Sequence, residues 1–197
     1  MIASIMVHSA HDIGRTRQLS KVKLGRYALS QRGYVSDTAQ NRVDDLHDMF
    51  LDPAVGLIVA AIGGDHSCHL LPLLDFDLIA AHPTLFMGYS DITVLNVAIW
   101  QRTGLITFNG PKLITDFAES TQMLEYTPSS FLTAVCDPDP IGSVTPSPWW
   151  TEEFLGWGRG RTSSVLGDRS PRRAGPGSTG TSPRAFSSGD AWSPCSI

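Results

Sequence analysis

A continuous run of apolar residues over 57–62 constrains the fold more than any other feature of this sequence. The run leads directly into the glycine pair Gly63 and Gly64. A strand with one face in water alternates apolar and polar residues, whereas a strand covered on both faces is apolar throughout. The run therefore predicts a parallel strand of an α/β sheet. Such sheets place ligands at the carboxyl ends of their strands, where glycines allow close approach of the backbone.

A second apolar segment, over 84–87, ends in Gly88, Tyr89 and Ser90 and turns into a helix-like stretch. A serine on a tight strand-to-helix turn exposes its hydroxyl, and the free amides of the first helical turn favour a developing oxyanion. This pattern predicts Ser90 as a nucleophile and the amide of Asp91 as an oxyanion donor. The alternative is an ordinary helix N-cap at Ser90, because Ile92 stands where the hydrolase elbow has its last glycine.

Hydrophobic period and turn residues predict the neighbouring elements. We expect a helix that starts at Asp37 or Thr38, buries Val43, Leu46 and Phe50 and ends at Asp52. Two helical pieces are expected over 70–74 and 78–81, the second of which stops near His82. A helix over 91–102 that buries Val94, Leu95 and Ala98 should end at Gly104, and a strand over 105–108 should follow it. Strands that alternate with helices over short links are parallel and joined by right-handed crossovers. Residues 33–157 are therefore expected to form an incomplete, doubly wound, mainly parallel α/β sheet, with 1–32 left unassigned.

Six short motifs make the segment from about residue 33 to 150 resemble the LD-carboxypeptidase and microcin C self-immunity family of serine peptidases. They are residues 33–36; Arg42 with 45–47 and Phe50; 62–67; 70–75; 88–93; and 107–111, in the family's order and at plausible spacing. The Gly-Gly-Asp-His form at 63–66 is closer to the immunity-protein branch than to the peptidoglycan-recycling branch.

The resemblance implies the N-terminal domain of that family and a role for each matching residue. Ser90 would be the nucleophile, and the amide of Asp91 with the backbone of Gly63 and Gly64 would form the oxyanion hole. The bond hydrolysed would be an amide next to a free carboxylate, in a murein tetrapeptide or in an aminoacyl-adenylate of the microcin C type. No cofactor and no metal is implied, and a homodimer is left open.

In that family a histidine oriented by a glutamate activates the serine, and both lie in a second, C-terminal domain. All six histidines of this sequence precede Ser90. A serine hydroxyl without a base is too weak a nucleophile to attack an amide at neutral pH. We therefore expect the chain to be a truncated and inactive fragment of a serine carboxypeptidase. The alternative is that it is a non-catalytic remnant or a binding module.

Composition changes near residue 158. Residues 1–157 hold 9 Lys and Arg against 17 Asp and Glu, a net charge of −8, whereas residues 158–197 hold 6 Arg against 2 Asp. Half of the last 40 residues, 20 in number, are Gly, Ser or Pro. A segment of this composition buries too little apolar surface to offset the entropy lost on ordering. We expect this tail to be disordered. A shifted reading frame is the favoured origin, and a genuine tail that contacts an acidic partner is the alternative.

Other candidate sites have plainer interpretations. Asp44 and Asp48 share a helix face and are expected to be solvated. His66 and His69 have a zinc-like spacing but no second ligand pair, and His66 is a weaker candidate for a local base. The negative charge of residues 1–157 argues against nucleic acid. Three scattered cysteines, an opening too short for a signal peptide and no membrane-length apolar run predict a cytoplasmic protein.

Overall fold

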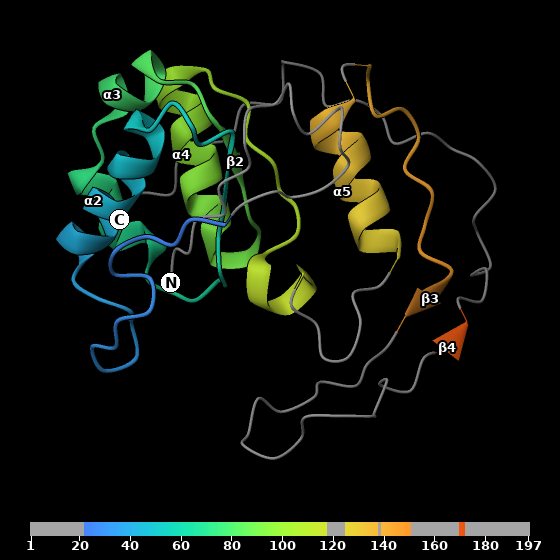
Figure 1. Cartoon of the computed structure of the whole chain (residues 1–197), viewed down its shortest axis with the longest axis horizontal. Helices are drawn as coiled ribbons and strands as arrows, with labels where there is room; N and C mark the ends of the chain where they lie inside the picture. The colour runs from blue at the N-terminus through green and yellow to red at the C-terminus, as the bar shows by residue number, and fades with distance from the viewer. Residues whose placement is uncertain (1–21, 118–124, 138, 151–169, 172–197) are drawn as a thin grey trace, which may run out of the picture.

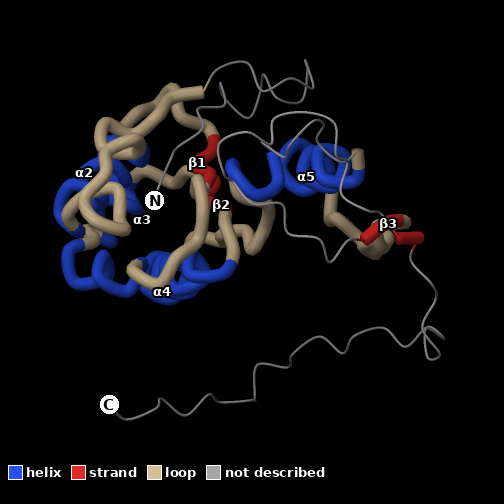
Figure 2. The backbone as a smooth tube through the Cα atoms, turned by 90° about the horizontal axis from the view of Figure 1, so that it is seen from below, coloured by secondary structure: helices blue, strands red, loops and turns tan. Residues whose placement is uncertain are grey.

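The computed structural model describes residues 22–117, 125–137, 139–150 and 170–171. Two parallel strands lie at its centre, β1 (Leu57–Val59) and β2 (Leu85–Met87), with Ile58 opposite Phe86. A single parallel bridge between Met87 and Phe108 extends the sheet on the other side of β2. Figures 1 and 2 show helices on both faces of these strands, as in a doubly wound sheet. The fold class is α/β, which confirms the prediction.

Three helices cover one face of the sheet: α2 (Ala39–Leu51), α3 (Phe76–Ala81) and α4 (Thr93–Thr103). A 3-10 helix, η1 (Ser67–Leu73), lies beside them. Helix α5 (Tyr126–Cys136) covers the other face, where Phe131 packs with Leu57, Val59 and Met87. Alternate residues of β1 therefore enter two separate cores, which is why its sequence is apolar without interruption.

Helix α2 follows its sequence pattern closely. Thr38 is the N-cap, and its side-chain oxygen accepts a hydrogen bond from the amide of Asn41 at 3.2 Å. Val43, Leu46 and Phe50 are at most 2% exposed, as predicted. Between them Asp45 is also buried, and its carboxylate accepts from the amide of Tyr27 at 2.9 Å. The helix thus fastens the preceding segment to the core.

Helix α4 corrects part of the prediction. Leu95 is fully buried as expected, but Val94 and Ala98 are only half-buried, and Ile99 takes the inward position instead. The α-helix begins at Thr93 rather than at Asp91, because the short 3-10 helix η2 (Ser90–Ile92) precedes it. The predicted end is confirmed, because Gly104 closes α4 in the left-handed conformation, with φ +75°.

The strands are shorter than predicted. The run over 57–62 is a strand only to Val59, because the carbonyl oxygens of Ala60 and Ala61 accept from Leu113 and Ile114, outside the ladder. The expected strand over 84–87 begins at Leu85, and that over 105–108 is reduced to the bridge at Phe108. The π-helical turn η3 (Leu113–Phe117) crosses the carboxyl end of β1. This is a tertiary contact, which the hydrophobic period of the sequence does not predict.

Two further features complete the described chain. Trp149–Trp150 (β3) pairs antiparallel with Ser170–Pro171 (β4). The predictions for residues 1–21 and for the rest of the tail lie outside the described residues and stay predictions. None of the helices in the described ranges combines the length and apolar character needed to cross a membrane.

Candidate active site

The turn after β2 is closely packed around Gly88. A Cβ atom there would lie 2.8 Å from Cγ2 of Ile92 and 3.0 Å from Cβ of Ala60, so no side chain fits without a shift. The buried Asn96 of α4 donates its amide to the carbonyl oxygens of Gly88, at 2.9 Å, and of Phe108, at 3.3 Å. Packing and hydrogen bonds together fix where the chain leaves the strand.

Ser90 stands at the end of this turn in a strained conformation. Its φ is +65°, and among the described residues it is the one non-glycine with a positive φ. For a residue with a Cβ this left-handed conformation costs on the order of 1–2 kcal/mol. The side chain is exposed rather than packed. Strain at an exposed serine between a strand and a helix is typical of a nucleophile elbow.

The glycine pair after β1 faces Ser90. A Cβ atom on Gly63 would lie 3.2 Å from both Cβ and Oγ of Ser90, so a side chain at Gly63 would crowd the hydroxyl. A Cβ on Gly64 would lie 3.5 Å from Oδ2 of Asp91. The structure therefore brings together Ser90, Asp91, Gly63 and Gly64, the residues that the sequence singled out.

The side chain of Asp91 holds the two turns together. Its Oδ2 accepts from the amides of His66, at 3.1 Å, and Ser67, at 3.0 Å, and from the Ser67 hydroxyl at 2.7 Å. Burial opposes ionisation of this carboxyl, but these hydrogen bonds and the charge of Arg42 outweigh it and lower the pKa of Asp91. Asp91 is therefore an ionised clamp between the ends of β1 and β2.

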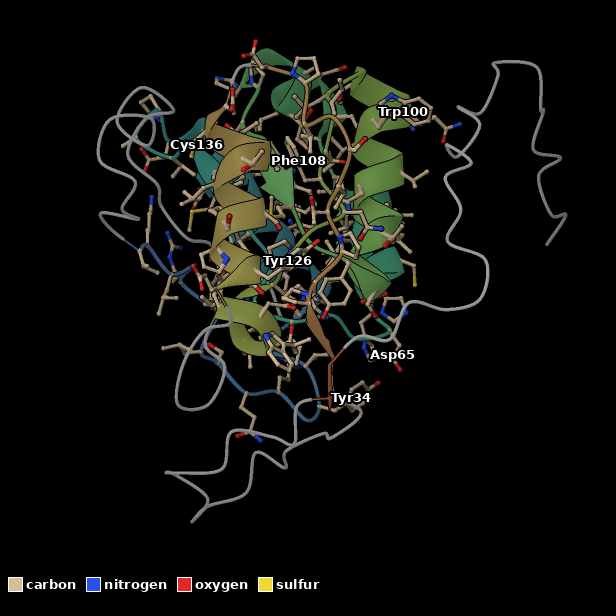
Figure 3. The ribbon with its side chains drawn as sticks, turned by 90° about the vertical axis from the view of Figure 1, so that its right-hand side faces the viewer. Tyr34, Asp65, Trp100, Phe108, Tyr126 and Cys136 are labelled. Carbon is tan, nitrogen blue, oxygen red and sulfur yellow. The ribbon has the colours of Figure 1, made fainter. Side chains whose placement is uncertain are left out.

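A cavity of about 270 Å³ opens beside the clamp. Tyr34 and Asp65, which Figure 3 shows at the same end of the molecule, line it together with Arg42, Gly63, Gly64 and Asp91, among others. Arg42 is 4% exposed, and its Nε has no hydrogen-bond partner in the described structure. Burial lowers the pKa of Arg42 and the nearby Asp91 opposes this, so the guanidinium remains the cation of the cavity wall.

The other candidates form contacts of their own. His66 pairs with Asp65 and lies 4.7 Å, ring to ring, from Tyr34. Within the described ranges no hydrogen bond joins an imidazole to Ser90. His66 and His69 meet edge to face, with ring centroids 5.7 Å apart, and the described residues contain no group of three or more ligands that could hold a metal. His47 accepts from the amide of Asp75 at 3.0 Å, a structural contact.

Sequence reasoning gave no supporting role to three polar residues of the site, although the motif at 62–67 includes Ser67. Ser67, Asn96 and Lys112 are all buried, at 0%, 6% and 5% exposure. Asn96 stands among apolar residues of α4, and a buried polar residue at such a position must find a partner, whereas nothing in the sequence around Ser67 marks it as buried. Lys112 follows the Gly-Pro pair at 110–111, and nothing in its local sequence marks it as buried.

Comparison with known proteins identifies the family of the chain. The model of the LD-carboxypeptidase N-terminal domain matches residues 8–110, more than half of the chain. The chain belongs to the LD-carboxypeptidase family. The match includes both turns of the site and begins well before residue 33, where the sequence motifs start.

Individual members of the LD-carboxypeptidase family show how much of the chain is shared. A probable murein peptide carboxypeptidase of Bacillus subtilis is 47% identical over 96 residues, covering 49% of this chain and 30% of its own length. The microcin C7 self-immunity protein MccF of Escherichia coli is 38% identical over 125 residues, covering 63% and 36%. A structure of MccF in complex with glutamyl sulfamoyl guanosine superposes with a TM-score of 0.66 at 31% identity, covering 76% of this chain and 44% of that one. The chain thus spans about a third of the length of these curated relatives.

Proposed function

We propose that this chain carries the nucleophile of a serine-type carboxypeptidase that hydrolyses an amide bond next to a free carboxylate. The observation that carries the proposal is the strained, exposed Ser90 with its hydroxyl against Gly63. Its Oγ attacks the carbonyl carbon of the substrate, and the amide of Asp91 with the backbone at Gly63 and Gly64 stabilises the oxyanion. The ionised Asp91 clamp holds these two sources of N–H groups in register.

The substrate class follows from the relatives. One is named for murein peptides and another for microcin C7 immunity, and a solved relative binds an aminoacyl sulfamoyl nucleoside. We therefore propose a small peptide or an aminoacyl-nucleotide as substrate and the cytoplasm as the site of action. Nucleic acid is not a proposed partner, since residues 1–157 carry a net charge of −8.

The described residues place no base at Ser90. Ser90 loses its proton only to a neighbouring base, and no histidine of the described structure is hydrogen-bonded to it. We propose that the histidine and glutamate come from the second domain of the family, and that the 197-residue chain alone does not turn over. Loss of both groups typically lowers turnover on the order of a million-fold.

A paired assay tests the proposal. The 197-residue chain and a fusion of it to an in-frame second domain of a family member are each given a murein tetrapeptide and glutamyl sulfamoyl adenosine. We expect hydrolysis by the fusion alone, abolished by Ser90→Ala. Turnover by the unfused chain that is lost on Ser90→Ala would overturn the need for a second domain. Turnover that survives Ser90→Ala in the fusion would overturn the nucleophile.

A further inference from the structure

Lys112 is brought to the site by the segment that crosses the end of β1. The amides of Leu113 and Ile114 donate to the carbonyl oxygens of Ala60, at 3.0 Å, and Ala61, at 2.9 Å. This pairing places the preceding residue, Lys112, beside the glycine pair, with only 5% of its surface exposed. A lysine on a loop would ordinarily extend into solvent, so its burial here requires an explanation.

The ammonium group of Lys112 borders the same small space as the Ser90 hydroxyl. A Cβ atom on Gly63 would lie 3.3 Å from Nζ of Lys112 and 3.2 Å from Oγ of Ser90. The same Nζ lies 3.8 Å from the centroid of the Tyr89 ring, a cation–π contact. The absent side chain of Gly63 therefore leaves a space that a nucleophile and a cation share.

This cation has no counter-ion in the described structure. The nearest acid along the chain, Asp116, uses Oδ2 to accept from the backbone amide of Lys112, at 2.9 Å, and from the Thr115 hydroxyl, at 2.7 Å. The two acids of the cavity wall are engaged elsewhere: Asp91 accepts from His66 and Ser67, and Asp65 pairs with the ring of His66. Burial lowers the pKa of Lys112 and Asp116 opposes this, as expected for an ammonium that is partly desolvated and incompletely compensated.

We propose that Lys112 binds the free carboxylate of the substrate and so sets the scissile bond beside Ser90. This rests on the proposed function and adds a specificity residue to it. An anion that enters the space beside Gly63 provides the counter-ion that the ammonium lacks, in surroundings where water competes poorly. A substrate without the carboxylate gains nothing from Lys112 and leaves it unpaired.

Alkylation of a thiol at the nucleophile position tests the proposal on the chain as it exists. In Ser90→Cys, the rates of reaction with iodoacetate, which carries a carboxylate, and with iodoacetamide, its neutral analogue, are measured by mass spectrometry of the peptide that contains the thiol. Both reagents attack the same thiolate, so their rate ratio cancels changes in the thiol pKa. Lys112→Met in this background should lower the iodoacetate to iodoacetamide ratio about tenfold.

Two matched variants complete the design. Lys112→Arg keeps a positive charge and should retain most of the ratio, whereas Lys23→Met removes a lysine paired with Asp52 away from the site and should leave it unchanged. In Ser90→Cys itself, 1 M salt should reduce the ratio through screening, which tests the charge without a second substitution. A ratio insensitive to both Lys112→Met and salt would overturn the proposal. Because alkylation needs no turnover, this result is independent of whether the chain hydrolyses anything.

Discussion

The two turns at the carboxyl edge of the sheet are held in different ways. The turn after β2 is fixed by its own neighbours, since Gly88 packs against Ile92 and Asn96 binds its carbonyl oxygen. The turn after β1 is fixed from outside, because His66 and Ser67 donate to Asp91 at the start of η2. The turn after β2, which carries Ser90, therefore holds the turn after β1 in place. A substitution that disturbs the turn after β2 should also disturb the turn after β1, whereas a substitution in the turn after β1 should leave the turn after β2 intact.

The largest expected effect comes from Gly88→Ala. The added methyl group meets Ile92 and Ala60 within 3.0 Å, and neither can move without disturbing α4 or β1. We expect the free energy of unfolding to fall by about 3 kcal/mol in urea titrations. Gly110→Ala is the matched control, because the atoms nearest its methyl group all belong to the flexible side chain of Met87, and it should cost about 1 kcal/mol or less. Equal losses would mean that the close packing around Gly88 does not make the turn after β2 more sensitive than the chain at Gly110.

Asp91→Asn should have a smaller and more local effect. The neutral amide is a poorer acceptor for the amides of His66 and Ser67, and we expect a loss of about 2 kcal/mol. Hydrogen exchange should show these two amides opening faster, while the amide of Gly88, which donates to Phe108 at 3.1 Å, keeps its protection. Asp65→Asn is the control, because it removes the exposed carboxylate that pairs with the His66 ring rather than with its amide, and it should leave both amides protected. If Gly88 loses protection together with His66, the dependence between the turns is mutual rather than one-way.

This asymmetry also explains what the sequence could predict. The turn after β2 is encoded locally: an apolar segment, Gly88 and Ser90 lie next to one another, and the family motif at 88–93 includes both of these residues. The Asp91 side chain accepts from His66 and Ser67, which lie 25 and 24 positions earlier in the chain. No periodic pattern in the sequence marks Asp91 as their acceptor. Asn96 and Lys112 are likewise defined by partners distant in sequence, and Arg42, although it belongs to a family motif, takes its role from the distant Asp91. Local pattern therefore located the nucleophile, whereas the groups that hold and charge the site required the tertiary structure.

Ser90→Gly sharpens the comparison by removing the strain of the turn after β2. Glycine adopts a φ of +65° without the clash that a Cβ causes, so Ser90→Gly should be more stable than Ser90→Ala by about 1 kcal/mol. Thermal unfolding of the two variants measures the difference. Ser30→Gly compared with Ser30→Ala is the control, since Ser30 has no positive φ and glycine there should be the less stable. If both sites favour alanine, the conformation of Ser90 carries no strain.

The smallest effect is the acid dependence of the clamp. The pKa of Asp91 in the folded chain is below its ordinary value of 3.8. The ionised carboxylate therefore stabilises the fold fully above pH 3.8, and this stabilisation is lost as the pH falls through the lower pKa of the folded state. The pKa of Asp45 is raised, chiefly by burial, so protonation of that residue acts in the opposite direction and partly masks the loss. Subtracting the stability of Asp91→Asn from that of the wild type at each pH cancels Asp45, which both share. The difference should be constant near neutral pH and shrink below pH 3.8, whereas a constant difference down to the acid transition would show that the charge of Asp91 does not hold the turn after β1.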